Sequence, residues 1–351
     1  MQDANIPLYD VAGFRFHENE SMAGIFFTNA GDSFPSFNFL RPYPFLGLPE
    51  PMFFSIPTPF TICSSSKGLL LIHDHPTSTY HVCNPFVHAR SSYWRLPAPP
   101  RFHSQGTPAV LAVDLYDPVV PSFYVVCAVQ EYSSYYTFDT FDSSTYGWRE
   151  ALNPMDIGPG PRRIIANTGV SDCQGRAFWL TSVPHAVVRY HGLFNTVEQH
   201  IIPQDPRLIN PWAALQLGRL GNFGVGVVAS WRQGVHLFLN DHDDVYRMFP
   251  TWEPQGFLHV RRDNEDAATG GGGFAEVICR RPQVRPGVLR FERDVPLWIN
   301  GRMTVWEVSH ENRRQPRTRL HQMPGWARVP ESVADSVPYV YTRMIPAQFI
   351  N

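Results

Sequence analysis

Short apolar runs, each opened by a glycine and followed by turn residues, recur along the chain. Runs of this length predict β-strands, because a helix needs a longer segment with a 3.6-residue period. Residues 123–129 predict a further buried strand, and residues 135–141 alternate in the manner of a half-buried one. We find no long, capped helical period, so the chain is predicted to be all-β. The glycine-opened runs are residues 68–72, 175–180, 234–239 and, less regularly, 301–306.

Segments that end in proline follow several of these runs and mark the ends of the repeating units. They recur roughly every 50 residues, and a repeat of that length with several short strands is typical of propeller blades. The last interval is longer and contains the glycines of residues 270–273, which predicts a flexible insertion at about residues 263–275. The closing prolines are Pro97, Pro154, Pro203, Pro250 and Pro324.

The five closing prolines account for five blades, and the two ends of the chain supply material for one more. Residues 23–28 and 339–343 are apolar and predict strands that could complete a blade together. Such closure would leave no open sheet edge. The sequence therefore predicts a single β-propeller domain over residues 1–351, with six blades, or seven as the alternative, closed by N- and C-terminal strands.

Composition supports this architecture and narrows the classes of partner. Proline makes up 33 of 351 residues, which favours many short segments over helices. A net charge of -2 gives no basic field for nucleic acid or an anionic membrane. The five cysteines contain no Cys-x-x-Cys pair, and their apolar surroundings predict buried free thiols. Without a secretory pattern at Met1, we expect the protein in the cytoplasm, the nucleus or both.

The candidate catalytic and metal motifs each have a simpler structural interpretation. His73, Asp74 and His75 could place two imidazoles on one strand face, but their position before a proline favours a polar turn. Residues 240–244 lack the spacing of a calcium loop and predict a solvated hairpin. Residues 64–67 match Ser-x-x-Lys without the helix that this motif requires. We therefore predict no catalytic, cofactor-binding or metal-binding residue, no cofactor and no enzymatic activity.

Arginines and tyrosines are the candidates for contact with a partner, since both residue types are enriched at protein interfaces. Separately, the arginine pairs predict ordinary solvated loops, and the tyrosines could equally belong to a blade core. The partner-binding residues therefore stay unknown at this level. The candidates are Arg162–Arg163, Arg261–Arg262, Arg280–Arg281, Arg313–Arg314, Tyr132, Tyr135 and Tyr136.

Several motifs stand in the order found in one known family of propeller domains. Residues 63–71 resemble the family's Ser-x-Gly-Leu-Leu strand, residues 80–85 its Cys-Asn-Pro turn, and residues 94–97 its Trp-x-x-Leu-Pro segment. Residues 141–148 and 175–180 resemble its later hairpin and Gly-x-x-x-Trp-Leu strand. Over roughly residues 8–250 the chain thus resembles the kelch-like, F-box-associated propeller domain of plant F-box proteins.

By resemblance, the protein would be the substrate-recognition part of an SCF-type ubiquitin ligase. In that family an F-box binds a Skp-type adaptor and thereby a cullin, and the propeller captures the target protein. No F-box pattern precedes Ala23, so adaptor binding would require an F-box upstream. The alternatives are an interaction or scaffold propeller without a ligase role, or a glycan-binding or enzymatic propeller using His73, His75 or residues 241–244.

Overall fold

Strands make up nearly all the regular structure of the computed structural model, which confirms the all-β prediction. The one described helical element is a single 3-10 turn, η3 (Ala166–Thr168). Across the described residues, no helix is long and apolar enough to cross a membrane. The structure describes residues 21–29, 38–40, 59–86, 93–114, 122–150, 154–201 with short gaps, and the strands between 214 and 341.

Three sheets between residues 60 and 201 follow one another in the chain. Each is antiparallel, with its main strands in sequence order. The first contains β3 (Phe60–Ser66), β4 (Leu69–Asp74), β5 (Thr79–Cys83) and β6 (Tyr93–Arg95). The second contains β7 (Ala109–Asp114), β8 (Ser122–Tyr132), β9 (Tyr135–Asp142) and β10 (Gly147–Arg149), with β11 (Met155–Asp156) also on β9. The third contains β12 (Val170–Ser171), β13 (Arg176–Leu180), β14 (Ala186–His191) and β15 (Thr196–Ile201).

The remaining strands form three more sheets. One contains β16 (Ala214–Arg219), β17 (Val225–Trp231), β18 (Gly234–Asn240) and β19 (Trp252–Arg262), with β20 (Ala275–Cys279) and β22 (Phe291–Glu292) added in parallel at its edges. Another contains β21 (Gly287–Val288), β23 (Val295–Ile299), β24 (Arg302–Ser309) and β25 (Arg317–Gln322). The last joins β2 (Asn38–Leu40), β1 (Ser21–Asn29) and β26 (Val333–Tyr341).

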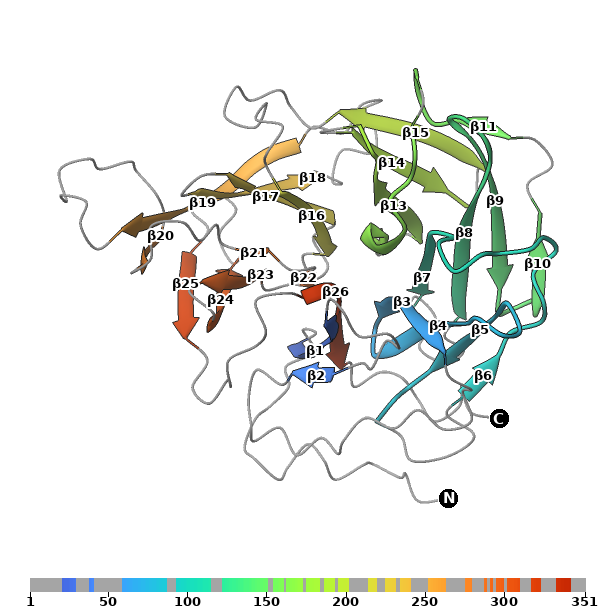
Figure 1. Ribbon diagram of the computed structural model, residues 1–351, viewed down its shortest axis with the longest axis horizontal. Helices are drawn as coiled ribbons and strands as arrows, with labels where there is room; N and C mark the ends of the chain where they lie inside the picture. The colour runs from blue at the N-terminus through green and yellow to red at the C-terminus, as the bar shows by residue number, and fades with distance from the viewer. Residues whose placement is uncertain are drawn as a thin grey trace.

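These sheets succeed one another around the molecule in chain order, as the colours of Figure 1 show. Successive antiparallel sheets arranged around a centre are the architecture of a β-propeller. The strands β4, β13, β18 and β24 begin at or next to the glycines that open the predicted runs. The strands predicted near the two ends pair with each other, since Phe26 of β1 is opposite Val337 of β26.

Tight turns and buried faces explain why the first sheet forms where it does. Lys67 and Gly68 both have positive φ, at 49° and 82°, which is the backbone of a two-residue hairpin that favours glycine. All six residues of β4 are buried. A strand buried on both faces requires a second sheet packed against the first, and the succession of sheets provides it.

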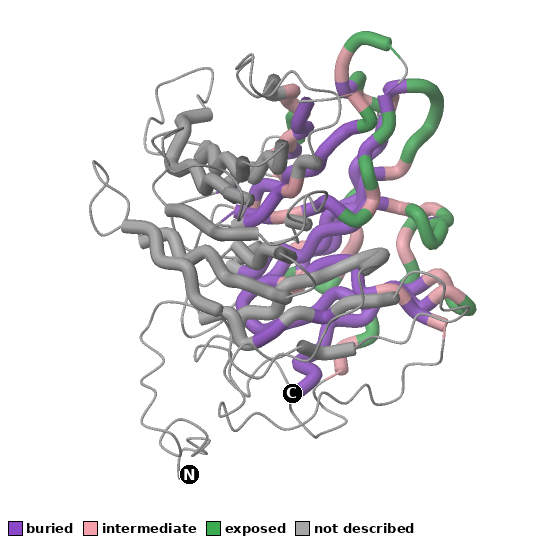
Figure 2. The backbone as a smooth tube through the Cα atoms, turned by 60° about the vertical axis from the view of Figure 1, so that its left-hand side comes forward, coloured by how far each residue is buried: buried purple, intermediate pink, exposed green. Residues whose placement is uncertain are grey.

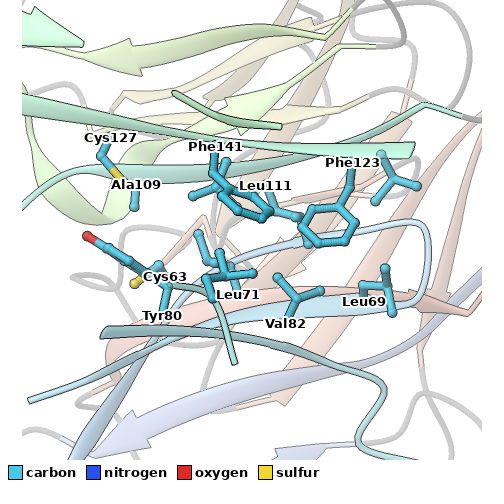
Figure 3. Packing of buried hydrophobic residues seen from close by; sticks show 13 residues of the cluster. Cys63, Leu69, Leu71, Tyr80, Val82, Ala109, Leu111, Phe123, Cys127 and Phe141 are labelled. Carbon is cyan, nitrogen blue, oxygen red and sulfur yellow. The ribbon is translucent and has the colours of Figure 1, made fainter. Parts of the chain in front are cut away.

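The best-described core lies between the first and second sheets (Figure 3). Leu71 and Tyr80 of the first sheet face Leu111, Phe123 and Phe141 of the second, and all five are at most 1% exposed. A second apolar cluster joins the second sheet to the third. In Figure 2 the buried stretches, in purple, lie inside the molecule, and the exposed ones, in green, lie in loops at its rim. Apolar burial of this kind supplies most of the driving force for folding.

Serine hydroxyls connect the inner strands of neighbouring sheets. The backbone N–H groups of Leu111 and Val113 in β7 donate to Ser64 Oγ and Ser66 Oγ of β3, at 3.3 and 3.4 Å. Ser171 Oγ of β12 donates to the Leu111 carbonyl at 2.9 Å. The strand β7 therefore receives polar contacts from both sides, which satisfies backbone groups that pack away from water.

The structure corrects the prediction that a polar turn begins directly after Ile72. His73 and Asp74 do not form an exposed polar turn, because β4 continues to Asp74 and both residues are buried. The pairing of Asp74 with Phe60 extends the strand beyond the apolar run, and the turn starts at His75. Cys63, Cys83 and Cys127 are buried free thiols as predicted. Residues 241–244, 263–274 and 280–281 lie outside the described residues, as do Arg313, Arg314 and Pro250.

Candidate protein-binding site on the connector face

One end of the second sheet gathers the loops that carry the candidate site. Antiparallel pairing places Ala109, the first residue of β7, opposite Cys127, from where β8 runs on to its hairpin with β9. The connector of residues 96–108, which joins β6 to β7, therefore arrives at the same end as the β8–β9 hairpin. We call this end the connector face. The β9–β10 hairpin, with Tyr146, lies at the opposite end.

Two adjacent residues of the connector have opposite environments. The side chain of Phe102 is 77% exposed, the largest exposure among the large apolar side chains described, whereas His103 is fully buried. An exposed phenylalanine is unfavourable in water. A buried neighbour fixes its position, so the connector presents Phe102 from a held backbone.

His103 is held by a chain of buried polar groups from both adjacent sheets. Its Nε2 is 3.0 Å from Asp139 Oδ2 on β9, and its Nδ1 is 3.1 Å from the Tyr80 hydroxyl on β5. All three residues have 0% exposure. The ring of Trp148 packs edge-on against the imidazole, with centroids 5.8 Å apart. The connector is therefore anchored to two sheets at once.

The proton positions in this chain follow from what each group can donate. An ionised Asp139 can only accept, so His103 Nε2–H donates to it. Burial raises the pKa of Tyr80 well above its usual value, so the tyrosine keeps its proton and donates to Nδ1. This order resembles the hydrogen-bond chain of a catalytic triad. Because none of the three side chains reaches the surface, the arrangement serves to hold the connector and offers a substrate no access.

Arg101, on the other side of Phe102, joins the connector to two carboxylates. Its Nη1 donates to Glu131 at the end of β8 at 3.0 Å, and its Nε and Nη2 donate to Glu150 after β10 at 2.7 and 2.5 Å. Thr137 Oγ1 donates to the same Glu131 oxygen at 2.9 Å. Charge-assisted contacts to two separate elements further restrict the connector.

The tyrosines of the β8–β9 hairpin divide into an exposed pair and a buried one. Tyr132 is 58% exposed and stacks on Tyr135, with ring centroids 4.7 Å apart. Tyr136 is buried, and its hydroxyl accepts a hydrogen bond from the Ile164 N–H at 2.9 Å. The sequence left open whether these residues belong to a core or to a surface, and the structure assigns both roles.

The candidate metal and catalytic residues that the structure describes have contacts within their own sheet or the next one. His75 Nε2 is 2.7 Å from Thr61 Oγ1, and its ring centroid lies 5.6 Å from that of His73. Burial lowers the pKa of His73 to about 4, assisted by His75 and His103. Among the residues that the structure describes, no three histidines, cysteines or acids are grouped to hold a metal ion. Ser64 is buried and accepts the backbone hydrogen bond of Leu111.

One candidate arginine pair has side chains that the structure describes. Arg162 is buried, and its Nε donates to the Pro159 carbonyl at 2.8 Å, so it is not a solvated loop charge. Arg163 is exposed. Arg261 and Arg262 belong to β19, but their side chains lie outside the described residues.

The sequence did not reveal Arg101, Phe102 and His103 as candidates. They stand in a short polar segment after Pro99 and Pro100, with no repeated spacing around them. Their partners lie 23 to 49 residues away in the chain. The sequence offered one weak indication of this site, namely an aromatic residue in a connector bounded by prolines.

No family model and no curated protein matches the sequence. Among solved structures, a putative 6-phosphogluconolactonase from Bacteroides uniformis has a TM-score of 0.39 and 11% identity, over 78% of this chain and 71% of that one. Virginiamycin B lyase from Staphylococcus aureus has a TM-score of 0.34 and 10% identity, over 78% and 87%. Kluyveromyces lactis Hsv2 has 0.35 and 10%, over 56% of this chain and 60% of its own. This chain thus matches less than two thirds of Hsv2, and we take no site or activity from these similarities.

Proposed function

We propose that this protein is a non-catalytic β-propeller of six blades, closed by the pairing of β1 with β26, that binds another protein through its connector face. The observation that carries the proposal is the contrast between two adjacent residues. Phe102 is 77% exposed, and the next residue, His103, is fully buried. The hydrogen bonds of His103 fix the backbone that exposes Phe102 to water, and a partner protein that covers this side chain would remove it from water.

A connector that is already fixed in the folded protein loses little conformational entropy when it binds a partner. A flexible loop loses conformational freedom when a partner orders it, whereas an anchored loop has already lost that freedom on folding. Phenylalanine, tyrosine and arginine are also enriched where protein interfaces are buried. The connector face offers all three, in Phe102, Tyr132, Tyr135 and Arg101.

Site-specific cross-linking tests the proposal. A photoreactive phenylalanine analogue is placed at position 102 and, in a matched control, at position 146, which is 50% exposed on the opposite end. Proteins captured in a native extract are identified, purified and measured with this protein as defined pairs. We expect a partner captured from position 102 that Phe102→Ala binds about tenfold more weakly. Equal capture from both positions, or binding unchanged by Phe102→Ala, would refute the proposal.

The resemblance to F-box-associated domains supports a narrower proposal, that the bound protein is a target for ubiquitination. Its test is independent of the connector face. The chain is expressed together with its upstream coding sequence, and a purified Skp-type adaptor is tested for co-elution. Co-elution supports the receptor role. Its failure with each upstream version assigns the protein to binding without a ligase role.

A further inference from the structure

We propose that the connector face recognises a protein segment in which an arginine or lysine stands next to an apolar side chain. This inference rests on the proposed function and specifies the chemistry of the partner. The acceptor surface consists of Phe102, Glu131, Tyr132, Tyr135 and Glu150, which we call the aromatic–acidic patch.

The charges that a partner would meet on this patch are negative. Arg101 pairs with both Glu131 and Glu150, so one guanidinium compensates two carboxylates. The carboxylate side chains are the more accessible groups, at 37% and 42% exposure, against 22% for Arg101. The cation is therefore the least accessible charged group of this cluster. A net negative, partly exposed cluster attracts a cationic side chain, most strongly at low salt.

Asp156 extends the acidic character toward the stacked tyrosines. It is exposed and pairs in register with Tyr135 on β9. Its Oδ1 accepts hydrogen bonds from Ser134 Oγ at 2.7 Å and from the Gly158 N–H at 3.0 Å. These hydrogen bonds lower the pKa of Asp156, so it stays ionised. Arg162, whose charge also lowers the pKa of Asp156, is buried.

The aromatic side chains supply the second half of the recognition chemistry. Phe102 and Tyr132 are both more than half exposed, and Tyr132 is braced by stacking on Tyr135. An aromatic ring face attracts a guanidinium or ammonium group, and its apolar area is covered well by an aliphatic neighbour. Carboxylates beside exposed rings therefore match a cation flanked by an apolar residue better than they match an acidic or a purely polar segment.

Three synthetic nine-residue peptides test this inference by fluorescence anisotropy with the full chain. The first alternates leucine and arginine, the second replaces the arginines by glutamates, and the third replaces the leucines by serines. We expect the leucine–arginine peptide to bind at least tenfold more tightly than either of the others, and its affinity to fall as salt is raised. Equal or tighter binding of the glutamate peptide would overturn the inference.

Variants of the patch separate this inference from the proposed function. Glu131→Gln/Glu150→Gln keeps the shape of both side chains, and we expect it to weaken the leucine–arginine peptide about tenfold and to flatten the salt dependence. Tyr146→Ala, at the opposite end, should leave binding unchanged, with melting temperatures confirming that each variant is folded. If Phe102→Ala weakens binding but the double glutamine variant does not, the face binds proteins and the charge inference falls. If neither changes binding, both proposals fall.

Discussion

Replacing His103 by alanine tests whether the buried anchor is held as the structure indicates. The substitution removes the imidazole, which is the hydrogen-bond partner of both the Tyr80 hydroxyl and the Asp139 carboxylate. The carboxylate then stays fully buried without the ring that donated to it. A buried carboxylate left without compensation in this way destabilises a protein by about 3–5 kcal/mol. For a chain of 351 residues, this corresponds to a fall in melting temperature of about 4–7 °C.

The assay is thermal and denaturant unfolding at pH 7, followed by circular dichroism. Tyr80→Phe, which removes one hydroxyl and leaves the ring, should lower the unfolding free energy by only about 1–2 kcal/mol. Adding Asp139→Asn to His103→Ala should recover about 1–2 kcal/mol, because the orphaned charge is removed as well.

Connector dynamics provide a second readout of the same variant. Residues 101–104 should exchange their amide hydrogens faster in His103→Ala than in the wild type, because the anchor that holds them is gone. The reasoning is refuted if His103→Ala unfolds within 1 kcal/mol of the wild type, or if Asp139→Asn deepens the loss instead of relieving it.

Three further predictions concern the surrounding sheets. Ser64→Ala should destabilise the protein by about 1–3 kcal/mol in chemical denaturation, because the buried Leu111 N–H loses its acceptor; an unchanged midpoint would contradict the contact. The pKa of His73 is lowered to about 4 in the folded protein. As the pH falls below about 6.5, this histidine therefore takes up a proton in the unfolded chain before it does so in the folded protein, and the free energy of unfolding decreases toward pH 4. Between pH 7 and 4, we expect the His73→Phe variant to lose about 2 kcal/mol less unfolding free energy than the wild type. The same pH dependence of stability in both proteins would contradict this prediction. Gly169→Ala should lower the melting temperature clearly, since its Cβ would lie 2.4 Å from Val110 Cγ2; a neutral effect would show that this contact yields.

The fold was predictable because its signals are local in the sequence. A glycine beside an apolar run sets a turn and the strand after it, as at Lys67 and Gly68, where positive φ angles form the hairpin. Residues 143–146 form the hairpin loop between β9 and β10, within the segment 141–148 that resembles a family hairpin. Pairing between β1 and β26 followed from two apolar segments near the ends, although β26 starts at Val333, before the predicted strand.

The candidate site was not predictable, because it depends on contacts between distant segments. Nothing around His103 indicates that it is buried, since its partners Tyr80 and Asp139 come from two other strands. The apparent metal motif at His73 was equally ambiguous, because pairing with β3 and β5 decides whether the strand ends at Ile72 or continues. Register and sheet packing, which no single segment encodes, determine these environments.

The central claim is that the protein binds a partner protein through the connector face, and cross-linking from position 102 tests it most directly. The account predicts a partner that is captured from position 102, is displaced by unlabelled wild-type protein, and is not captured from position 146. A chain that captures nothing specific from position 102, or that captures the same proteins from both ends, would contradict it.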